Sequence, residues 1–295
     1  MYKPYDRSQL QNVINLIVGC NNSESYQVGF VGDGYEEVRE TLLYDFSDLP
    51  LEESIYTYEE DDVFTCFAFD ISTRDKYVEV WGPFLDKHIG LDKVYNLWVY
   101  AMEHLHPLKL NYNFFIGAHN QLAINFLEDY VKADRIRQHD NLEFKISNRS
   151  FSNIRLPNNV QVIKVETLSQ NYYTALVNLH HRYFPGTYYS IDDILERINR
   201  ENNLYLLIKN HQLAGYAYLE KSTTDKHVSL EYIAIDGAFQ GQGLSKLLFA
   251  SIVKETEQDE FSHIQLCVDE NNQRALNLYE SLGFFLASSY IHYKL

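Results

Sequence analysis

A glycine-rich turn at residues 237–243 has the residue types that bind a phosphate group. The stretch LEYIAI (230–235) predicts a strand before the turn, and LSKLLFASI (244–252) predicts a helix after it. Gly241 and Gly243 let the backbone turn tightly, and the unpaired amides at a helix start favour negative charge. The turn alone is also typical of an ordinary helix start, so both interpretations stay open.

A second stretch, VDENNQRALNLYESLGF (268–284), follows a predicted strand at 264–268. Together with the glycine-rich turn, it resembles motifs A and B of the GNAT superfamily, the N-acetyltransferases that use acyl-coenzyme A. In the family's first motif, Q/R-x-x-G-x-G/A, the named positions fall on Gln240, Gly243 and Ser245. Serine departs from the pattern at the last position, but it is small and its hydroxyl could donate to a phosphate.

The resemblance implies that acetyl-coenzyme A (acetyl-CoA) binds beside the turn and that no metal takes part. The family's two central strands, here ending near Ile235 and Val268, splay apart and admit the pantetheine arm. Backbone groups of the first strand would pair with that arm, and the amides of the turn would hold the pyrophosphate. The cofactor-binding residues implied in this way are Ile233, Ala234, Ile235, Gln240, Gly241, Gln242, Gly243, Leu244, Ser245, Asn272 and Tyr279.

The family transfers the acyl group directly from the thioester to an amine in a ternary complex, so no enzyme nucleophile is required. Glu231 is the candidate base for the ammonium proton, because it precedes the acyl site on the same strand. An outward Glu on the wet face of the strand is an equal alternative. Tyr279 matches the family's acid, which protonates the departing thiolate, whereas the alternative for this tyrosine is a core position.

Histidines and aromatic residues outside these motifs give weaker signals. The histidines at 104–106 and 180–181 lack further ligands at metal-binding spacing, so we expect surface or cleft histidines. The stretch HHRYFPGTYY (180–189) lies between two predicted helices, in the segment that borders the acceptor site in the family. Its aromatic side chains either select the substrate or simply pack around a Pro-Gly turn.

The elements that position these motifs follow from hydrophobic periodicity. In the first half, the sequence predicts helices from Ser8 to a stop at Gly19 and over 35–44, 91–106 and 120–130, with strands at 63–71, 77–85 and 113–117. No element is predicted for the acidic stretch 52–62. In the second half, the sequence predicts strands at 160–165, 205–209, 214–220 and 228–235, and helices capped by Ser169 and Ser190.

The two halves repeat one another. Glu79 in VEV and Glu231 in LEY lie 152 residues apart, as do Asn120 and Asn272, which open NQLAINFL and NQRALNLY. GLDK (90–93) likewise matches GLSK (243–246), and TRDK (73–76) matches TTDK (223–226). This register predicts a duplicated α+β fold, two tandem GNAT folds, each a mixed, mostly antiparallel sheet flanked by helices. We place the domains at 1–150 and 151–295, and the pattern of the first domain predicts no counterpart of strand 160–165.

The first copy departs from the phosphate-binding pattern. Aligning GLDK with GLSK sets His88 and Asp92 against Gly241 and Ser245, which puts a carboxylate where the pyrophosphate would lie. Leu127 replaces the tyrosine acid. We therefore expect 1–150 to be a degenerate GNAT-like domain, serving as scaffold or substrate wall, and 151–295 to be the catalytic N-acetyltransferase domain.

Charge and composition exclude several other classes of function. The net charge is −16, and residues 1–150 hold most of it, with 13 Lys and Arg against 25 Asp and Glu. Binding to nucleic acid or to an anionic membrane depends on basic residues, so neither is expected. The field favours a cationic acceptor, although runs such as EEDD (59–62) are also typical of a solvated face.

The apolar runs are too short to cross a membrane, and MYKPYDRSQL lacks an apolar signal core, so we expect a cytoplasmic protein. Cys20, Cys66 and Cys267 have apolar neighbours and are expected to be buried thiols. The leading hypothesis is an acyl-CoA dependent N-acyltransferase that acetylates a primary amine of a small molecule or peptide. The alternative is a GNAT-like protein that binds the cofactor without turnover. Aminoacyl transfer from tRNA by a Fem-like tandem is disfavoured by the acidity.

Overall fold

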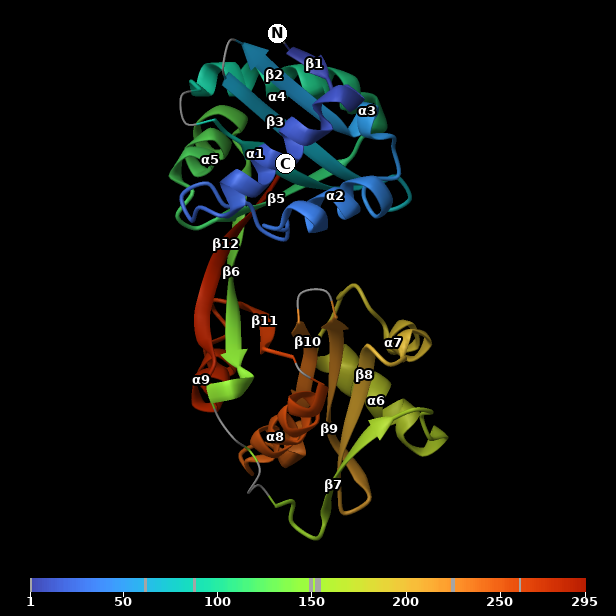
Figure 1. Cartoon of the computed structure of the whole chain (residues 1–295). Coiled ribbons are helices and arrows are strands. Elements are labelled where there is room, and N and C mark those ends of the chain that lie inside the picture. Colours follow the sequence, from blue (N-terminus) through green and yellow to red (C-terminus); the bar gives the residue numbers. More distant parts are fainter. Residues whose placement is uncertain are drawn as a thin grey trace. The chain divides into compact units, whose positions relative to one another are not determined.

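The computed structural model describes residues 2–60, 63–86, 89–148, 151, 155–223, 226–259 and 261–295. The chain forms two compact units. The first unit runs to Asp140 and also includes Asp269–Asn271 and Ser288–Leu295. The second unit comprises Asn141–Val268 and Asn272–Ala287. Figure 1 colours the chain along its sequence, so the return of its last residues to the first unit can be followed there.

The first half of the chain begins with a short strand and then alternates helices and strands. Its elements are β1 (Tyr2–Pro4), α1 (Leu10–Asn21), α2 (Tyr35–Tyr44), α3 (Leu51–Ser54), β2 (Ile55–Glu60), β3 (Val63–Ser72), β4 (Tyr77–Phe84), α4 (Leu91–Leu105), β5 (Asn111–Gly117), α5 (Gln121–Asn125) and β6 (Asp134–Lys145). A π-helical segment, Phe126–Val131, follows α5.

The second half repeats that order. Its elements are β7 (Val160–Val165), α6 (Gln170–Tyr183), α7 (Ile191–Arg197), β8 (Asn202–Lys209), β9 (Gln212–Ser222), β10 (His227–Ile235), α8 (Leu244–Thr256), β11 (His263–Asp269), α9 (Gln273–Leu282) and β12 (Phe285–Lys294). Ser190 and Asp193 form the capping box of α7. Ser169 occupies the N-cap position of α6, but its side chain makes no capping hydrogen bond there.

Strand pairing confirms the duplicated fold. Strands β1 to β4 pair antiparallel in sequence order and β4 pairs parallel with β5. Strands β7 to β10 likewise pair antiparallel and β10 pairs parallel with β11. Asn120 and Asn272 cap equivalent helices, accepting hydrogen bonds from the amides of Ala123 at 3.1 Å and Ala275 at 3.2 Å. Each half is therefore a mixed, mostly antiparallel sheet flanked by helices.

The halves exchange their last strands. Residues Tyr290–Lys294 of β12 pair antiparallel with β5 in the first unit, although they close the second half of the sequence. Leu142 and Phe144 of β6, which close the first half, belong to the core of the second unit. The sequence placed a boundary near 150, whereas the first unit ends at Asp140 and regains the final eight residues. Local patterns do not reveal which neighbour a strand pairs with, so this exchange has no signal in the periodicity.

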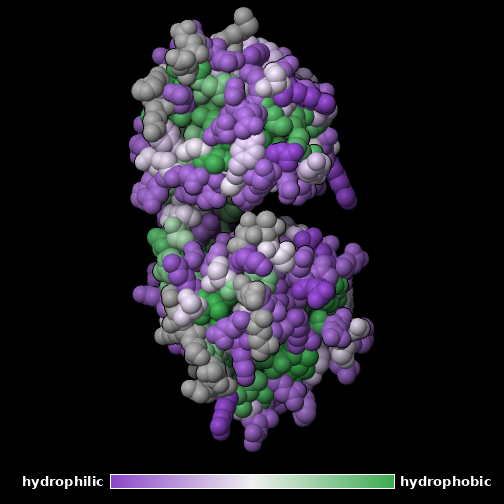
Figure 2. Space-filling model, in the orientation of Figure 1, coloured by the Kyte–Doolittle hydropathy of each residue, from purple (hydrophilic) through white to green (hydrophobic). Residues whose placement is uncertain are grey.

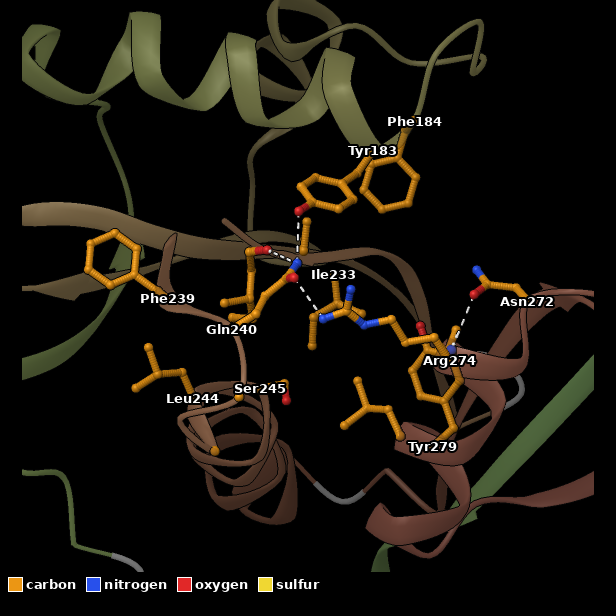
Figure 3. A pocket seen from close by; sticks show the side chains of 16 residues that line it. Tyr183, Phe184, Ile233, Phe239, Gln240, Leu244, Ser245, Asn272, Arg274 and Tyr279 are labelled. Atoms are coloured by element: carbon orange, nitrogen blue, oxygen red, sulfur yellow. Dashed lines mark hydrogen bonds between the residues drawn. The ribbon is translucent and has the colours of Figure 1, made fainter. Parts of the chain in front are cut away.

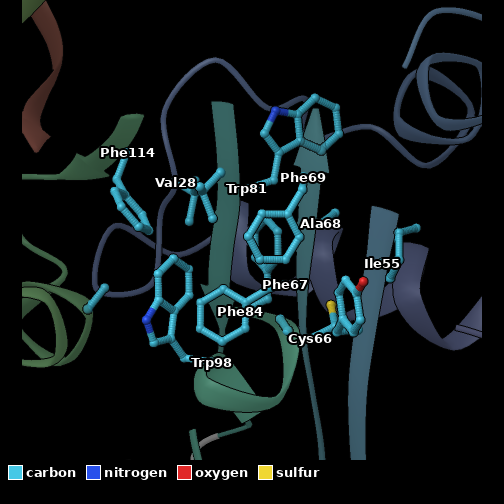
Figure 4. Packing of buried hydrophobic residues seen from close by; sticks show 14 of the residues in the cluster. Val28, Ile55, Cys66, Phe67, Ala68, Phe69, Trp81, Phe84, Trp98 and Phe114 are labelled. Carbon is cyan, nitrogen blue, oxygen red and sulfur yellow. The ribbon is translucent and has the colours of Figure 1, made fainter. Parts of the chain in front are cut away.

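The first unit has a core rich in aromatic side chains. Trp98 of α4 contacts Phe67 of β3 and Phe114 of β5, with ring centroids 5.6 and 5.5 Å apart (Figure 4). Phe84 of β4 is fully buried in the same cluster. Hydrophilic side chains cover most of the visible face of each unit, and hydrophobic ones are exposed there in scattered patches (Figure 2).

The second unit has a core on each face of its sheet. Successive residues of β8 alternate between them: Leu207 packs with α8, whereas Leu206 packs with α6 and α7. The second unit is thus a three-layer sandwich, in which the sheet lies between α8 on one side and α6 and α7 on the other. None of the helices in the described ranges has the length and apolar character that crossing a bilayer requires.

Several sequence-based expectations were wrong. The first half does have a counterpart of β7, because β1 pairs with β2, but three residues are too few to show a period. Strand β2 lies within the acidic stretch 52–62, where the charges hid Ile55 and Tyr56, both buried. Helix α1 continues through Gly19 to Asn21. Residues 61–62 of the EEDD run lie outside the described residues, as do residues 87–88 and 224–225, which entered the comparison of the two halves.

The cysteine prediction holds in part. Cys20 and Cys66 are buried, and burial raises the pKa of the Cys20 thiol to about 11. Cys267, in contrast, is exposed on β11, where it alternates with the buried Leu266 and Val268. Alternation along a strand sends a residue between two apolar neighbours to the opposite face, so an apolar flank does not by itself imply burial.

The exchange of β12 predicts that the last strand of the sequence stabilises the first unit. Ile291 is 3% exposed, so Ile291→Ala should lower the free energy of unfolding of that unit by about 2–5 kcal/mol. Both tryptophans, Trp81 and Trp98, lie in the first unit, so the urea transition followed by tryptophan fluorescence reports on it. Leu286→Ala, at a 58% exposed position of the same strand, is the control and should leave that transition unchanged. An unaltered midpoint in the Ile291 variant would contradict the exchange.

Candidate active site

Strand β10 changes the face it presents at Glu231. Its pairing with β9 shifts register between Leu230 and Tyr232, so Glu231 is the extra residue of a β-bulge. Leu230 packs with α8 before the bulge, and Tyr232 packs with α6 and α7 after it. The bulge therefore turns Ile233 and Ile235 toward the α8 side, where both are half-buried.

Beyond the bulge, β10 and β11 part. They pair in parallel over His227–Ser229 and His263–Gln265, at the start of both strands. In the described part of the chain, β10 continues to Ile235 and β11 to Asp269 with no further pairing between them. The resemblance predicted this separation, and the strands open a gap toward their carboxyl ends.

The peptide groups of Ile233 and Ile235 point into this gap. The Asp236 amide donates to the Ala214 carbonyl at 2.9 Å, so Asp236 directs its peptide groups toward β9. Successive residues of an antiparallel strand alternate in that direction, and Ala234 therefore faces β9 as well. The peptide groups of Ile233 and Ile235 are left facing the opposite side.

The glycine-rich turn ends β10 and starts α8. Gly241 and Gly243 have φ angles of 74° and 72°, in the left-handed region that side chains with a Cβ rarely adopt. Gly243 is the N-cap residue of α8. A Cβ built on either glycine would meet no atom within 4 Å, so both are required for their backbone conformation and the space beside the turn is open.

These elements surround a cavity of about 280 Å³ (Figure 3). It is lined by Tyr183, Phe184, Ile233, Ala234, Ile235, Phe239, Gln240, Gly241, Gly243, Leu244, Ser245, Asn272, Arg274, Ala275, Leu278 and Tyr279. The structure thus brings together all the predicted cofactor-binding residues except Gln242. That side chain is exposed and accepts a hydrogen bond from Lys209 instead.

Gln240 joins three elements at the edge of this cavity. Its Nε2 donates to the Ile235 carbonyl and to the Tyr183 hydroxyl, both at 2.8 Å. Its Oε1 accepts a hydrogen bond of 2.7 Å from Nη2 of Arg274, in the first turn of α9 (Figure 3). The amide of Gln240 therefore fixes the guanidinium of Arg274 beside the turn.

The cavity also contains residues that the motifs did not predict. Arg274 is exposed at the surface and also lines the cavity, where it supplies positive charge close to the helix starts of α8 and α9. Tyr183 and Phe184 come from the end of α6, and Phe239 precedes the turn. Arg274 could have been found from sequence, because it lies two residues after the capping Asn272 and so in the first helical turn.

Tyr279 lies on the α9 side of the cavity, one helical turn after Ala275. Its ring contacts that of Phe284, with centroids 5.4 Å apart. Burial raises the pKa of the Tyr279 hydroxyl to about 12, so this hydroxyl keeps its proton at neutral pH. Such a group can donate a proton to a stronger base that forms nearby.

Glu231 is not among the residues that line the cavity. It is half-buried at the bulge and accepts a hydrogen bond from the hydroxyl of Tyr188. Burial raises the pKa of its carboxyl group, Glu220 raises it further, and the Tyr188 hydrogen bond and Arg197 oppose this change. The carboxylate thus faces the loop between α6 and α7. The alternative interpretation from the sequence, an outward Glu on the wet face of the strand, would have placed it in open solvent.

The histidines expected at the surface or in a cleft divide between two environments. His181 is exposed, but His180 is 5% exposed. The ring of His180 is hydrogen-bonded to the Tyr216 hydroxyl at 2.6 Å and to the Tyr189 carbonyl at 2.8 Å. His180 therefore anchors the loop 184–190 to the sheet. Among the described residues, no group of three or more potential metal ligands comes together.

In the first unit, the chain itself fills the corresponding gap. β4 pairs with β5 only as far as Phe114, and β12 occupies the opposite edge of β5. Past that point, the Gly29 amide donates to the Phe115 carbonyl at 2.7 Å, and the Gly117 amide donates to the Gln27 carbonyl at 2.9 Å. The loop between α1 and α2 is longer than its counterpart between α6 and α7. It thus occupies the edge of β5 that corresponds to the open edge of β11 in the second unit.

Other positions in the first unit also differ. Gly90, the N-cap residue of α4, has a φ of −79°, whereas its counterpart Gly243 is left-handed. Asp92 lies in the first turn of α4, as the alignment predicted. Leu127, the counterpart of Tyr279, is fully buried. Gly90 therefore lacks the left-handed backbone conformation of Gly243.

The sequence of the second unit matches a known family. Residues 173–284 match the model of the acetyltransferase (GNAT) family. Among curated proteins, mycothiol acetyltransferase of Brachybacterium faecium is 26% identical over 85 residues, which is 28% of this chain and 26% of that protein. The spore coat polysaccharide biosynthesis protein SpsD of Bacillus subtilis is 27% identical over 120 residues, 38% of this chain and 41% of that protein. The matched stretches thus span about a quarter and two fifths of those relatives.

Solved structures resemble the whole chain. A GCN5-related N-acetyltransferase from Sphaerobacter thermophilus superposes with a TM-score of 0.74 and 14% identity, covering 100% of this chain and 95% of that one. A tandem GNAT protein from the clavulanic acid biosynthesis pathway superposes with a TM-score of 0.67 and 12% identity, covering 100% and 98%. At these identities, the likeness concerns the fold.

The left-handed turn predicts a specific effect of Gly243→Ala. Placing a Cβ at a φ of 72° costs about 1–2 kcal/mol, and relief of this strain would redirect the amides at the start of α8. Affinity for CoA, measured by calorimetry, should fall at least tenfold. Gly186→Ala introduces the same strain at a φ of 72° outside the cavity, so it should destabilise the chain comparably and leave CoA affinity unchanged. Equal CoA affinity in both variants would exclude the turn from the binding site.

Proposed function

On the premise that this chain is a tandem protein of the GNAT acetyltransferase family, we propose that it transfers the acetyl group of acetyl-CoA to a primary amine. The second unit carries the reaction, by direct attack of the amine in a ternary complex. The observation that carries this proposal is the gap between β10 and β11, into which Ile233 and Ile235 direct their peptide groups. When bound, acetyl-CoA supplies a thioester and a thiolate leaving group.

The residues around the cavity fit such a co-substrate. The peptide groups of Ile233 and Ile235 can pair with an extended amide-bearing arm as a strand edge does. The left-handed glycines leave open space before the amides that start α8, where a pyrophosphate is favoured. Arg274 adds a fixed guanidinium, and a hydrogen bond between charged groups contributes roughly 1.5–3 kcal/mol.

Two residues are assigned to the proton transfers. Tyr279 keeps its proton at neutral pH, and we assign it to protonate the thiolate as the thiolate leaves. Glu231 can accept the proton of the substrate ammonium only while its own carboxyl group is ionised. The rate should therefore rise with pH through the pKa of Glu231, which burial places above its ordinary value.

The first unit serves as scaffold or as part of the acceptor surroundings and takes no cofactor. Gln27 and Gly29 occupy the edge of β5 that would have to be free, and Gly90 lacks the left-handed conformation of Gly243. The amine acceptor belongs to a small molecule or a peptide. The acidity of the chain favours a cationic acceptor over an anionic one.

The assignment of Tyr279 is tested by Tyr279→Phe. Loss of the acid should lower kcat roughly a hundredfold and leave the affinity for acetyl-CoA unchanged, because general acid catalysis typically contributes 10²–10⁴-fold. Turnover is measured as thiol release with a panel of polyamines, aminoglycosides, amino acids and peptides. Should the unaltered chain bind acetyl-CoA but acetylate no amine in the panel, a cofactor-sensing protein becomes the better description.

The filled gap in the first unit predicts a single cofactor site. Calorimetric titration with acetyl-CoA should give one molecule per chain, and the Gly243→Ala variant should lose that one site without revealing another. Asp92→Ser, which restores the second unit's residue at this position, should not create a second site, because Gln27 and Gly29 still occupy the strand edge. A stoichiometry of two would refute the assignment of the first unit.

A further inference from the structure

The carboxylate of Glu231 is reached through Tyr188. The Tyr188 hydroxyl donates to Oε2 of Glu231, and the tyrosine itself is 67% exposed. Glu231 is half-buried, so the exposed tyrosine stands between this carboxylate and the solvent. The Tyr188 hydroxyl thus connects the half-buried carboxylate to a side chain that is largely exposed.

Aromatic contacts connect Tyr188, through the ring of Tyr232, to Phe184 in the lining of the cavity. The ring of Tyr232 lies between two others: its centroid is 4.9 Å from that of Phe184, which lines the cavity, and 6.0 Å from that of Tyr188. The Tyr232 hydroxyl is hydrogen-bonded to Oγ1 of Thr187 at 2.7 Å, which ties the preceding residue of the loop to β10. The position of the Tyr188 hydroxyl is therefore set by the sheet.

Glu231 is hydrogen-bonded to Tyr188 of the loop, whereas the nearby charged residues are paired with one another. Glu220 is already engaged, because Nη2 of Arg197 lies 3.0 Å from its Oε1 and the Tyr218 hydroxyl donates to the same atom at 2.8 Å. The titratable and charged groups that act on Glu231 and Tyr188 from the packed elements are Tyr189, Arg197, Glu220 and Tyr232.

We propose that Tyr188 relays the proton from the acceptor amine to Glu231. The inference rests on the proposed acetyl transfer and adds a catalytic residue to it. Before the amine attacks, the ammonium proton passes to the Tyr188 oxygen while the hydroxyl proton of Tyr188 passes to Oε2 of Glu231. The amine becomes neutral, the tyrosine ends as a neutral phenol, and Glu231 ends protonated, so charge and protons balance.

The relay explains why Tyr188 is exposed while its partner is not. The pKa of the Tyr188 hydroxyl is raised, by burial of its polar end and by the charge of Glu231, so a free phenolate is disfavoured and both protons move together. Partial burial of the Glu231 carboxylate raises its basicity. The relay lets this carboxylate exchange protons with the substrate all the same. No movement of the loop is required.

The test compares Tyr188→Phe with a matched control. Tyr173 in α6 also donates its hydroxyl to a carboxylate, Oδ1 of Asp192 at 2.7 Å, and it lines no part of the cavity. Rates are measured against pH with acetyl-CoA and the amine of the panel that the unaltered chain acetylates fastest. Tyr188→Phe should lower kcat at least tenfold, whereas Tyr173→Phe should leave kcat unchanged.

The pH profile separates a relay from a packing role. The Tyr188 hydroxyl stabilises the charged form of Glu231, so its removal should raise the pKa of Glu231 and move the acid limb of the profile to higher pH. The double variant Tyr188→Phe/Glu231→Gln should be no slower than the slower single variant, because both residues serve one proton path.

Two outcomes overturn the relay. An unchanged or higher kcat in Tyr188→Phe would show that Tyr188 merely covers Glu231, and an unshifted acid limb would show that the two groups do not share a proton. Acetyl-CoA affinity equal to that of the unaltered chain verifies that the variant is folded. If the unaltered chain acetylates no amine, the proposed function fails, and the relay fails with it. Failure of the relay alone leaves turnover intact in Tyr188→Phe.

Discussion

The site depends on how early the pairing of β10 with β11 ends. Parallel pairing stops at Ser229, and every later peptide group on that edge of β10 must find another partner. The bulge at Glu231 follows directly after this point, and it moves the side chains of Ile233 and Ile235 to the α8 face. Gln240 takes up the Ile235 carbonyl, and the cavity occupies what remains of the gap. Had the two strands stayed paired to their ends, the glycine-rich turn would start a helix beside a closed sheet.

A chain of net charge −16 can still offer a favourable place for a polyanion, because the decisive groups are local. Distant surface charges are screened beyond about 8 Å at physiological salt, whereas amides at a helix start and a fixed guanidinium act in direct contact. Gln240 contributes to this by holding Arg274 near the turn. The first unit makes the complementary point. Glu79, the counterpart of Glu231, has its pKa raised to about 7 by burial and by Asp70, although the gap next to its strand is filled. A half-buried carboxylate is thus part of the duplicated strand, and a cofactor route is a separate requirement.

Much of this could be predicted from the sequence where a local pattern carries the information. The register of 152 residues gave the duplication, helix α2 was predicted to the residue, and the glycines at 241 and 243 marked a turn that only glycine adopts readily. What escaped prediction depends on contacts between distant segments. Strand β1 is too short to show a hydrophobic periodicity. No motif indicates that Gln27 and Gly29 form backbone hydrogen bonds with β5. The hydrogen bond between Tyr188 and Glu231 joins residues 43 positions apart, and it decides what surrounds the carboxylate.

The exchange of final strands sets the order in which the molecule can be completed. During synthesis, the segment that ends at Asp140 leaves the ribosome before Ser288–Leu295, and until then its sheet lacks the strand that borders β5. The first unit therefore keeps an open sheet edge and part of its apolar core uncovered until Ser288–Leu295 have been made. For the same reason, cutting the gene between the halves would yield two fragments that each lack a strand, rather than two independent proteins.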